Sequence, residues 1–338
     1  MACGRCEFSR GLAIRALMAV MTLFALFQGT AHAQSYATKP TRVIVGGPAG
    51  GLIDLTARVY AENFGAQLKQ SFFVENRPGA NELVGLGAVA QAEPGGYTLF
   101  MGSNGLTALP VLLKSAANRD VLKEITPVGN VLTFNTVFLA RPDVPYSTID
   151  ELITYMKRNP GKAVYAGGGG FTALQSAWFR AITKVNALYV AYGAGPQAYQ
   201  AIAGGQADFM LQILGPAISA SAAGKAKLLA ITGNKRNEAL PAVPSLKESQ
   251  DPEVRKLADT TFGTTWIGLF APVGTSSAVI AVLAKAKAES IRDPQLVARL
   301  KSFYGELPSD TPESFTQAFI ADAATYKTVA AQVGIQPE

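Results

Sequence analysis

Short apolar runs alternate with segments of helical periodicity along most of this chain. Residues 41–46 form one such run and predict a strand, and over residues 54–69 apolar side chains recur on one helix face: Leu55, Val59, Phe64 and Leu68. The same unit repeats, with strands predicted over residues 72–75, 97–101, 163–166 and 188–191 and helices over 85–93, 172–183 and 197–203. This alternation is typical of parallel strands joined by crossover helices, so we predict an α/β fold.

Local signals give several helix ends. Ser147 and Asp150 predict a capping box for a helix that ends near Asn159, and Thr311 before Pro312 predicts the start of a long final helix that reaches about Val333. The pair Asp150 and Glu151 is therefore interpreted as part of a helix cap and not as an acid–base dyad. No low-complexity linker interrupts the chain, which indicates that its parts are joined by strands.

The first 33 residues have the pattern of a secretory signal peptide. Arg5, Arg10 and Arg15 precede an apolar run over residues 17–27, and Ala31-His32-Ala33 matches a cleavage site. The alternative is a membrane anchor, but the run is shorter than the roughly 20 residues that span a bilayer. We predict cleavage of residues 1–33, a mature protein that begins near Gln34, and no later membrane span.

The predicted leader contains both cysteines, Cys3 and Cys6, and the single histidine, His32. The mature protein then lacks thiolate nucleophiles, disulfides, histidine bases and the usual zinc or copper ligands. No serine lies in a G-x-S-x-G context, and no lysine lies in a recognisable catalytic motif. An enzyme on this scaffold is the competing class, but the sequence favours a protein without catalytic residues, metal or cofactor.

The whole chain has a formal net charge of +6, and the leader's three arginines and one glutamate account for part of it. The remaining charge is small and contains no lysine or arginine run. Together with the absence of a helix-turn-helix pattern or an aromatic-basic platform, this argues against a nucleic-acid partner.

Two glycine-rich turns each join a predicted strand to a predicted helix. Residues 46–51 (GGPAGG) can direct backbone N–H groups at an anion near the helix N-terminus. Leu52 stands where a phosphate loop needs lysine, so nucleotide binding is not indicated. Residues 167–170 are four consecutive glycines with the same placement. The alternatives are a tight turn that needs glycine for positive φ at the first site and a surface loop at the second.

The chain resembles the substrate-binding receptors of tripartite tricarboxylate transporters, the Bug-type receptors, over residues 36–335. The resemblance depends on separated blocks in a fixed order: RVIVGGPAGGLIDLTAR (42–58), VENRPGA (74–80), GGYTLFMGSNG (95–105), ITPVG (125–129), NPGK (159–162), GGQADFM (204–210), AGKAKLLAIT (223–232), ALPAVPS (239–245) and WIGLFAPVGT (266–275).

The resemblance implies a two-lobed, type II-like periplasmic-binding-protein clamshell, in which each lobe is a mainly parallel sheet flanked by helices. Hinge strands are expected around residues 131–141 and 261–271, with lobe one over 36–137 plus 262–338 and lobe two over 138–261. It also implies a monomeric periplasmic receptor that captures a small organic carboxylate and delivers it to membrane permease subunits. A ligand-sensing module that signals to a membrane partner is the alternative, because both roles need the same fold.

The candidate ligand contacts come from both glycine-rich turns and the matching blocks: Gly47, Pro48, Ala49, Gly50, Gly51, Leu52, Asp54, Ser103, Asn104, Gly168, Gly169, Gly170, Phe171, Thr172, Tyr192, Gln212 and Trp266. Two of them have a structural alternative: Asp54 suits a first helical turn because of the helix dipole, and Trp266 suits a core beside Phe262 and Phe270. Arg58 and Arg77 are expected on the surface. We expect the ligand carboxylate on the amides of Gly50 and Gly51.

Several positions depart from the family pattern. Gly46-Gly47 replaces Pro-Phe, Leu52-Ile53 replaces Gly-Thr, Asn81-Glu82-Leu83 replaces Gly-Gly-Asn, Gly193 replaces lysine, and Gln212 replaces aspartate. The exchange at Gly47 predicts added volume, and Leu52, Ile53 and Leu83 predict an apolar wall. We therefore expect a monocarboxylate or dicarboxylate with a larger apolar or aromatic body.

Overall fold

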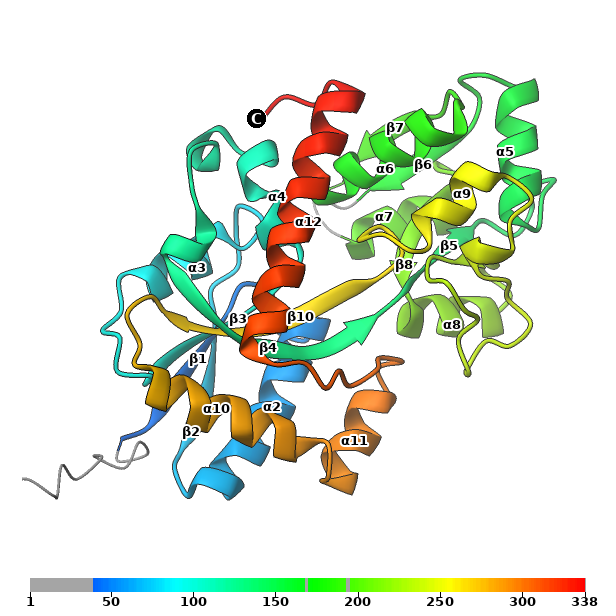
Figure 1. Ribbon diagram of the computed structural model, residues 1–338. Coiled ribbons are helices and arrows are strands. Elements are labelled where there is room, and N and C mark those ends of the chain that lie inside the picture. Colours follow the sequence, from blue (N-terminus) through cyan, green and yellow to red (C-terminus); the bar gives the residue numbers. More distant parts are fainter. Residues whose placement is uncertain (1–38, 168–169, 193–194, 338) are drawn as a thin grey trace, which may run out of the picture. The chain divides into compact units, whose positions relative to one another are not determined.

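The computed structural model describes residues 39–167, 170–192 and 195–337, and these contain two five-stranded sheets flanked by helices (Figure 1). We call the first sheet with its helices lobe one. Its strands are β1 (Thr41–Val45), β2 (Phe72–Asn76), β3 (Thr98–Ser103), β4 (Ile125–Phe134) and β10 (Thr265–Pro272). Its helices are α2 (Leu52–Leu68), α3 (Leu83–Ala90), α4 (Gly105–Leu112), α10 (Ser277–Ser290), α11 (Pro294–Lys301) and α12 (Pro312–Val333).

Lobe two is built on the second sheet. Its strands are β5 (Thr136–Ala140), β6 (Val164–Gly167), β7 (Leu188–Ala191), β8 (Phe209–Ile213) and β9 (Lys227–Ile231). Its helices are α5 (Ile149–Arg158), α6 (Gly170–Thr183), α7 (Gly195–Ala203), α8 (Leu214–Ala222) and α9 (Pro252–Leu257). The helices and strands named in the sequence analysis are present, with ends within a few residues of those expected.

The two sheets have the same topology. The strand order is β2-β1-β3-β10-β4 in one and β7-β6-β8-β5-β9 in the other. In each sheet the fourth strand, β10 or β5, is antiparallel to both neighbours, and the remaining pairs are parallel. The predicted two-lobed, mainly parallel α/β fold is therefore confirmed, and the antiparallel strand is in each case one that enters from the other lobe.

Two crossover segments connect the lobes. Asn135 alone separates β4 from β5, and residues 232–264 lead from β9 through α9 to β10. The Asn135 Nδ2 atom donates to the Gly263 carbonyl at 2.7 Å, and Thr232 Oγ1 donates to the same carbonyl at 2.9 Å. The two crossovers are thus hydrogen-bonded to each other where they meet. The residue limits proposed for the lobes in the sequence analysis stay a prediction.

The helix ends agree with the sequence signals except at α5. Thr311 caps α12 by accepting from the Ser314 amide, with Pro312 in the first turn as predicted. At α5 the cap is Thr148, whose side chain accepts from the Glu151 amide at 3.2 Å, so the predicted Ser147 cap is one residue early. Ser147 still contributes, because its amide donates to the Glu151 carboxylate at 2.6 Å. Glu151 is therefore part of a cap, as expected, whereas the predicted capping role of Asp150 is wrong, because its carboxylate accepts from Ser249 and the Gln250 amide.

Each lobe has its own apolar core, and two helices of lobe one reach the core of lobe two. Phe100, Phe270 and Trp266 belong to the lobe-one cluster. The lobe-two cluster includes Ala108 and Leu112 of α4 and Tyr326 of α12 beside residues of its own sheet. Both helices contact α6, and Figure 1 shows α12 in red beside it. Within the described ranges, no helix combines the length and apolar composition needed to cross a membrane.

Candidate functional site

The first glycine-rich turn lies where β1 ends and α2 begins. Gly50 has φ +78°, a left-handed conformation that favours glycine, and a Cβ there would meet nothing within 4 Å. Gly51 is the N-cap of α2 in an extended conformation and offers no side chain to the helix N-terminus. Pro48, Ala49 and Gly50 are exposed. The turn therefore leaves the N-terminal end of α2 uncapped and open to solvent.

Asp54 stabilises this turn through a hydrogen bond to its backbone. It is 2% exposed and accepts the Gly50 amide at 2.9 Å and Arg58 Nε at 3.0 Å, with Arg58 also paired to its second oxygen. Burial raises the pKa of Asp54, but the hydrogen bonds from Arg58 and Gly50 outweigh it, so the pKa lies below its usual value. Asp54 is an ionised brace for the turn, which favours its structural alternative over direct ligand contact.

The backbone donors of the turn are partly used inside the protein. The Gly50 amide is bonded to Asp54, and the Gly51 amide donates to the Pro48 carbonyl at 3.1 Å. These are the two amides expected to hold the ligand carboxylate, so the geometry does not favour that assignment. The first helical hydrogen bond of α2 runs from the Leu55 amide to the Gly51 carbonyl. The amides of Leu52, Ile53 and Asp54 therefore have no acceptor in the described chain. The available donors are thus those of the next three residues, in the first turn of α2.

Gly46 and Gly47 each lie against a neighbouring side chain. A Cβ on Gly47 would lie 3.4 Å from Ile53 Cδ1, and a Cβ on Gly46 would lie 2.7 Å from Glu82 Cβ. Ile53 thus contributes apolar surface beside the turn, and the added volume expected at Gly47 stays a prediction.

Glu82 lies beside the carboxyl ends of β1 and β3, and it was not among the candidate residues. It precedes α3 with φ +74°, and both of its carboxylate oxygens are bonded to Ser103: one accepts the Ser103 amide at 2.9 Å and the other the Ser103 hydroxyl. Its carboxyl group is buried, although part of the residue is exposed. The sequence signal that could have identified Glu82 is the replacement of a family glycine by glutamate, at a position where φ is positive.

Burial raises the pKa of Glu82 to about 7, against the two hydrogen bonds from Ser103 that lower it. A carboxyl whose pKa is higher in the folded than in the unfolded state binds protons more tightly when folded. The stability it confers is complete below its unfolded pKa of about 4.5 and is lost as pH rises through about 7.

We expect the free energy of unfolding to fall by about 1 to 3 kcal/mol between pH 4.5 and pH 7.5 through this group alone. Glu82→Gln should remove that part of the pH dependence, because glutamine does not titrate. Urea unfolding of both proteins at several pH values measures the difference. Parallel profiles for the two proteins would contradict the raised pKa.

Ser103 and Asn104 serve the structure of the sheet edge. Both donors of Ser103 are bonded to Glu82, and Asn104 is 1% exposed. The Asn104 Nδ2 atom donates to the Tyr326 hydroxyl at 3.2 Å, and its amide donates to the Trp266 carbonyl at 3.2 Å. The Ser103 donors are thus used within the protein, whereas the buried Asn104 Oδ1 atom has no hydrogen-bond partner among the described residues.

The second glycine-rich turn lies only partly within the described residues. Gly168 and Gly169 are outside them, as is Gly193, and of Phe171 only the backbone is described, in the first turn of α6. Gly170 begins α6, and Thr172 Oγ1 lies 3.1 Å from the Tyr189 hydroxyl. A Cβ on Gly167 would lie 2.3 Å from that same hydroxyl, so glycine is required there for packing. The strand-to-helix placement of this turn is as predicted.

Tyr192 and Gln212 lie at strand ends in lobe two. The Tyr192 amide donates to the Gly167 carbonyl at 2.7 Å, and its ring packs partly buried against the lobe-two core. Gln212 is part-buried near the end of β8, and its Oε1 atom accepts the Ile213 amide at 2.9 Å. Both side chains are partly exposed at the end of lobe two that carries the second turn.

Trp266 belongs to the core of lobe one. It is 6% exposed, its ring centroid lies 5.0 Å from that of Phe315, and it also contacts Phe270 and Phe319. Its Nε1 atom donates to Asp322 Oδ2 at 2.7 Å. These contacts favour the core alternative for Trp266, and a contact with ligand stays a prediction.

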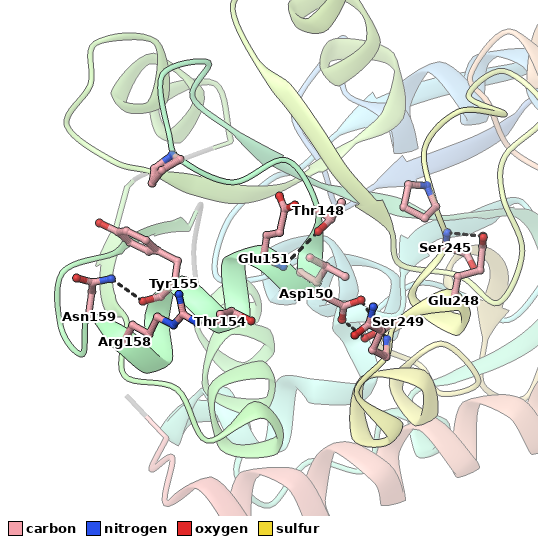
Figure 2. Close-up of a pocket in the computed structure, with 14 residues that line it drawn as sticks. Thr148, Asp150, Glu151, Thr154, Tyr155, Arg158, Asn159, Ser245, Glu248 and Ser249 are labelled. Atoms are coloured by element: carbon pink, nitrogen blue, oxygen red, sulfur yellow. Dashed lines mark hydrogen bonds between the residues drawn. The ribbon is translucent and has the colours of Figure 1, made fainter.

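A hollow of about 860 Å³ lies in lobe two between α5 and residues 244–250 (Figure 2). Several of its polar groups are bonded within the protein: Thr148 caps α5, the Asp150 carboxylate accepts from Ser249 and from the Gln250 amide, and the Ser245 amide donates to Glu248. Figure 2 shows Asp150 of α5 facing Ser249, whereas the Thr148 and Ser245 contacts lie at the start of α5 and within residues 245–248. Much of the polar lining of the hollow is therefore engaged in helix caps and turns.

The arrangement supports binding of an anion better than it supports catalysis. Among the described residues, no group of three or more His, Cys, Asp or Glu side chains is placed to hold a metal ion. The free amides of the α2 N-terminus are oriented donors at the positive end of a helix dipole, which is a favourable place for an anion.

Comparison with known proteins agrees with this chemistry. The family model described as the tripartite tricarboxylate transporter family receptor matches residues 56–332. A UPF0065 protein of Bordetella pertussis is 32% identical over 315 residues, which cover 91% of this chain and 94% of that protein. Protein BugT of Bordetella pertussis is 28% identical, over 90% of this chain and 93% of that protein.

Two solved structures have the same fold. The periplasmic binding protein BugD superposes with a TM-score of 0.76 at 27% identity, covering 90% of this chain and 100% of that one. MatC from Rhodopseudomonas palustris with bound malate superposes with a TM-score of 0.74 at 25% identity, covering 86% and 99%. With the two-lobed fold and the family match over most of its length, this chain belongs to the Bug-type tripartite tricarboxylate transporter receptors, a family of periplasmic solute-binding proteins.

Proposed function

We propose that this protein is an exported solute-binding receptor that captures a small organic carboxylate between its lobes and delivers it to the permease subunits of a tripartite tricarboxylate-type transporter, without chemical change to the ligand. The observation that carries the proposal is the uncapped N-terminus of α2, whose first-turn amides at Leu52, Ile53 and Asp54 have no acceptor among the described residues.

The position of this helix end supports the proposal. β1 is flanked by β2 on one side and β3 on the other, so the chain leaves its carboxyl end at a point where the strand order reverses. Ligands of open α/β sheets bind outside the carboxyl ends of strands at such switch points. The adjacent residues 48–50 are exposed, so an anion can approach the amides.

The family relationship supports the ligand class and the partner. MatC, which has the same fold, was solved with malate, and the matched family model is that of a receptor for a transporter. We propose that the ligand here carries a carboxylate on a body with apolar or aromatic character, because Leu52 and Ile53 place apolar side chains beside the free amides. Export would follow from the signal-peptide pattern of residues 1–33, which lie outside the described part of the chain.

Replacing Leu52 with proline tests the amide donors directly. Proline suits the first position of a helix, and the preceding Gly51 already has φ −73° and ψ 165°, the extended conformation that a following proline requires. Leu52→Pro should therefore keep the fold while it removes one N–H donor. Since a hydrogen bond to a charged group contributes about 1.5 to 3 kcal/mol, carboxylate affinity should fall roughly tenfold to a hundredfold.

Leu52→Ala is the matched control, because it removes the same side chain and keeps the N–H. A thermal-shift panel of benzoate, phenylacetate, succinate, adipate and citrate identifies a binding acid, and calorimetry then gives its dissociation constant for the three proteins. Equal affinities of Leu52→Pro and Leu52→Ala would contradict the role of this helix end.

A further inference from the structure

Two helices of lobe one, α2 and α4, begin at the carboxyl ends of β1 and β3. The groups that face their N-termini differ. The first-turn amides of α2 have no acceptor within the described chain, as shown above. The start of α4 faces the Glu82 carboxylate, which takes both the amide and the hydroxyl of Ser103, while the Gly105 amide donates to the Ser103 hydroxyl oxygen at 3.2 Å. One end is thus open, and the other already contains a carboxylate that belongs to the protein.

The backbone is strained to place Glu82 there. Ala80, Asn81 and Glu82 have φ values of +46°, +49° and +74°, and Gly79 before them also has positive φ. Three consecutive non-glycine residues in the left-handed region are costly, and such strain tends to persist where a side chain must be held in a specific place. The turn therefore directs the Glu82 side chain onto the sheet edge.

Gly46 and Gly102 make room for this side chain beside β1 and in β3. A Cβ on Gly46 at the end of β1 would lie 2.7 Å from Glu82 Cβ, and a Cβ on Gly102 in β3 would lie 2.6 Å from Glu82 Oε2. A Cβ on Gly105, the first residue of α4, would lie 3.6 Å from Glu82 Oε1. The carboxylate therefore occupies a fitted space between β1, β3 and α4, directly beside the glycine-rich turn that follows Gly46.

We propose that Glu82 is a specificity-determining residue of the carboxylate site: it takes the Ser103 donors and fills the sheet-edge space with a negative charge, so that lobe one accepts one ligand carboxylate at α2 and disfavours a second anionic group beside it. This inference depends on the proposed function, because it concerns the same site. Glu82 would thus favour acids that have no second charged group close to the carboxylate bound at α2.

The surroundings of Glu82 leave its charge without a cationic partner in the described chain. Ser103 is the polar residue that faces it from β3, whereas β1 and α4 present Gly46 and Gly105. A second anion beside it would therefore meet an unneutralised carboxylate, and the burial of that carboxylate strengthens the repulsion. Protonation of Glu82, whose pKa burial raises to about 7, would weaken that repulsion below neutral pH.

Matched pairs of acids with the same carbon skeleton test the proposal: butyrate with succinate, and hexanoate with adipate. Calorimetry on the full mature protein gives the ratio of diacid to monoacid affinity at pH 6 and pH 8. Glu82→Gly, which suits φ +74°, should raise this ratio at pH 8 by at least tenfold, because it removes the charge and frees the Ser103 donors. Wild-type protein should itself show a higher ratio at pH 6 than at pH 8.

Asn81→Gly is the control, since it relieves the neighbouring strained residue at φ +49° and keeps Glu82. It should leave the ratio within twofold of wild type. An unchanged ratio in Glu82→Gly while monoacids still bind would overturn the inference and leave the proposed function intact. If no acid of either pair or of the wider carboxylate panel bound wild type or either variant, the proposed function and this inference would both be overturned.

Discussion

Replacing Lys287 with methionine is expected to destabilise the folded protein by about 3 to 5 kcal/mol, because it leaves a partly buried carboxylate without its cation. Lys287 on α10 is 2% exposed. Its Nζ atom pairs with the Asp310 carboxylate and also donates to the Pro308 carbonyl at 3.1 Å. The other Asp310 oxygen accepts the Asn130 amide in β4 at 3.0 Å. The pair thus connects α10, the segment before α12 and the first crossover strand.

Two further variants make this test specific. Lys287→Met combined with Asp310→Asn should recover part of the lost stability, because no unpaired charge then remains buried. Lys285→Met is the matched control on the same helix: Lys285 pairs with Glu289 at 3.9 Å, and its side chain is 77% exposed, so the change should stay within about 0.5 kcal/mol. Urea unfolding measures all four proteins, and a loss below about 1 kcal/mol in Lys287→Met would contradict the assigned role.

The fold was largely predictable because its signals are local. Most strands and helices could be located from the lengths of the apolar runs and from the Gly and Pro residues that end them. The capping pattern at Thr311 located the start of the long final helix. The error at α5 is also local: Thr148 and Ser147 are both good caps, and the choice depends on which side chain reaches the Glu151 amide. Sequence signals of this kind do not distinguish adjacent capping residues.

The site was less predictable, because it depends on contacts between segments far apart in the chain. The glycine-rich turn and the helix after it could be recognised, but the internal use of the Gly50 amide by Asp54 depends on the exact turn geometry. Glu82 could be seen as a departure from the family pattern, whereas its bonds to Ser103, 21 residues later, could not. A substitution alone does not show whether a new carboxylate faces solvent, ligand or the protein's own amides.

Trp266 shows how a family motif can point to a core residue. Its place in β10 puts it in a strand whose residues are all buried, and Phe270, Phe315 and Phe319 surround its ring. The block that contains it is part of the family pattern because it forms the second crossover strand. A large aromatic residue in such a block is as consistent with packing as with a ligand wall.

Trp266→Ala should therefore cost about 3 to 5 kcal/mol of stability, the range for loss of a buried aromatic ring, and leave carboxylate affinity within twofold. The cavity is only part of the expected cost, because Asp322 loses the Nε1 donor at 2.7 Å. Burial raises the pKa of Asp322 while the hydrogen bonds from Trp266 and Thr261 lower it, so removal of Trp266 should raise that pKa further.

Trp266→Phe separates the two contributions. Phenylalanine keeps most of the ring contact with Phe315 and removes only the donor, so the loss should be about 1 to 3 kcal/mol, and it should shrink at acidic pH, where Asp322 is protonated in both proteins. Denaturant unfolding at two pH values gives the stabilities, and calorimetry with the acid identified by the panel gives the affinity. A Trp266→Ala protein that unfolds like wild type and has lost carboxylate binding would place Trp266 in the ligand site and refute its assignment to the core.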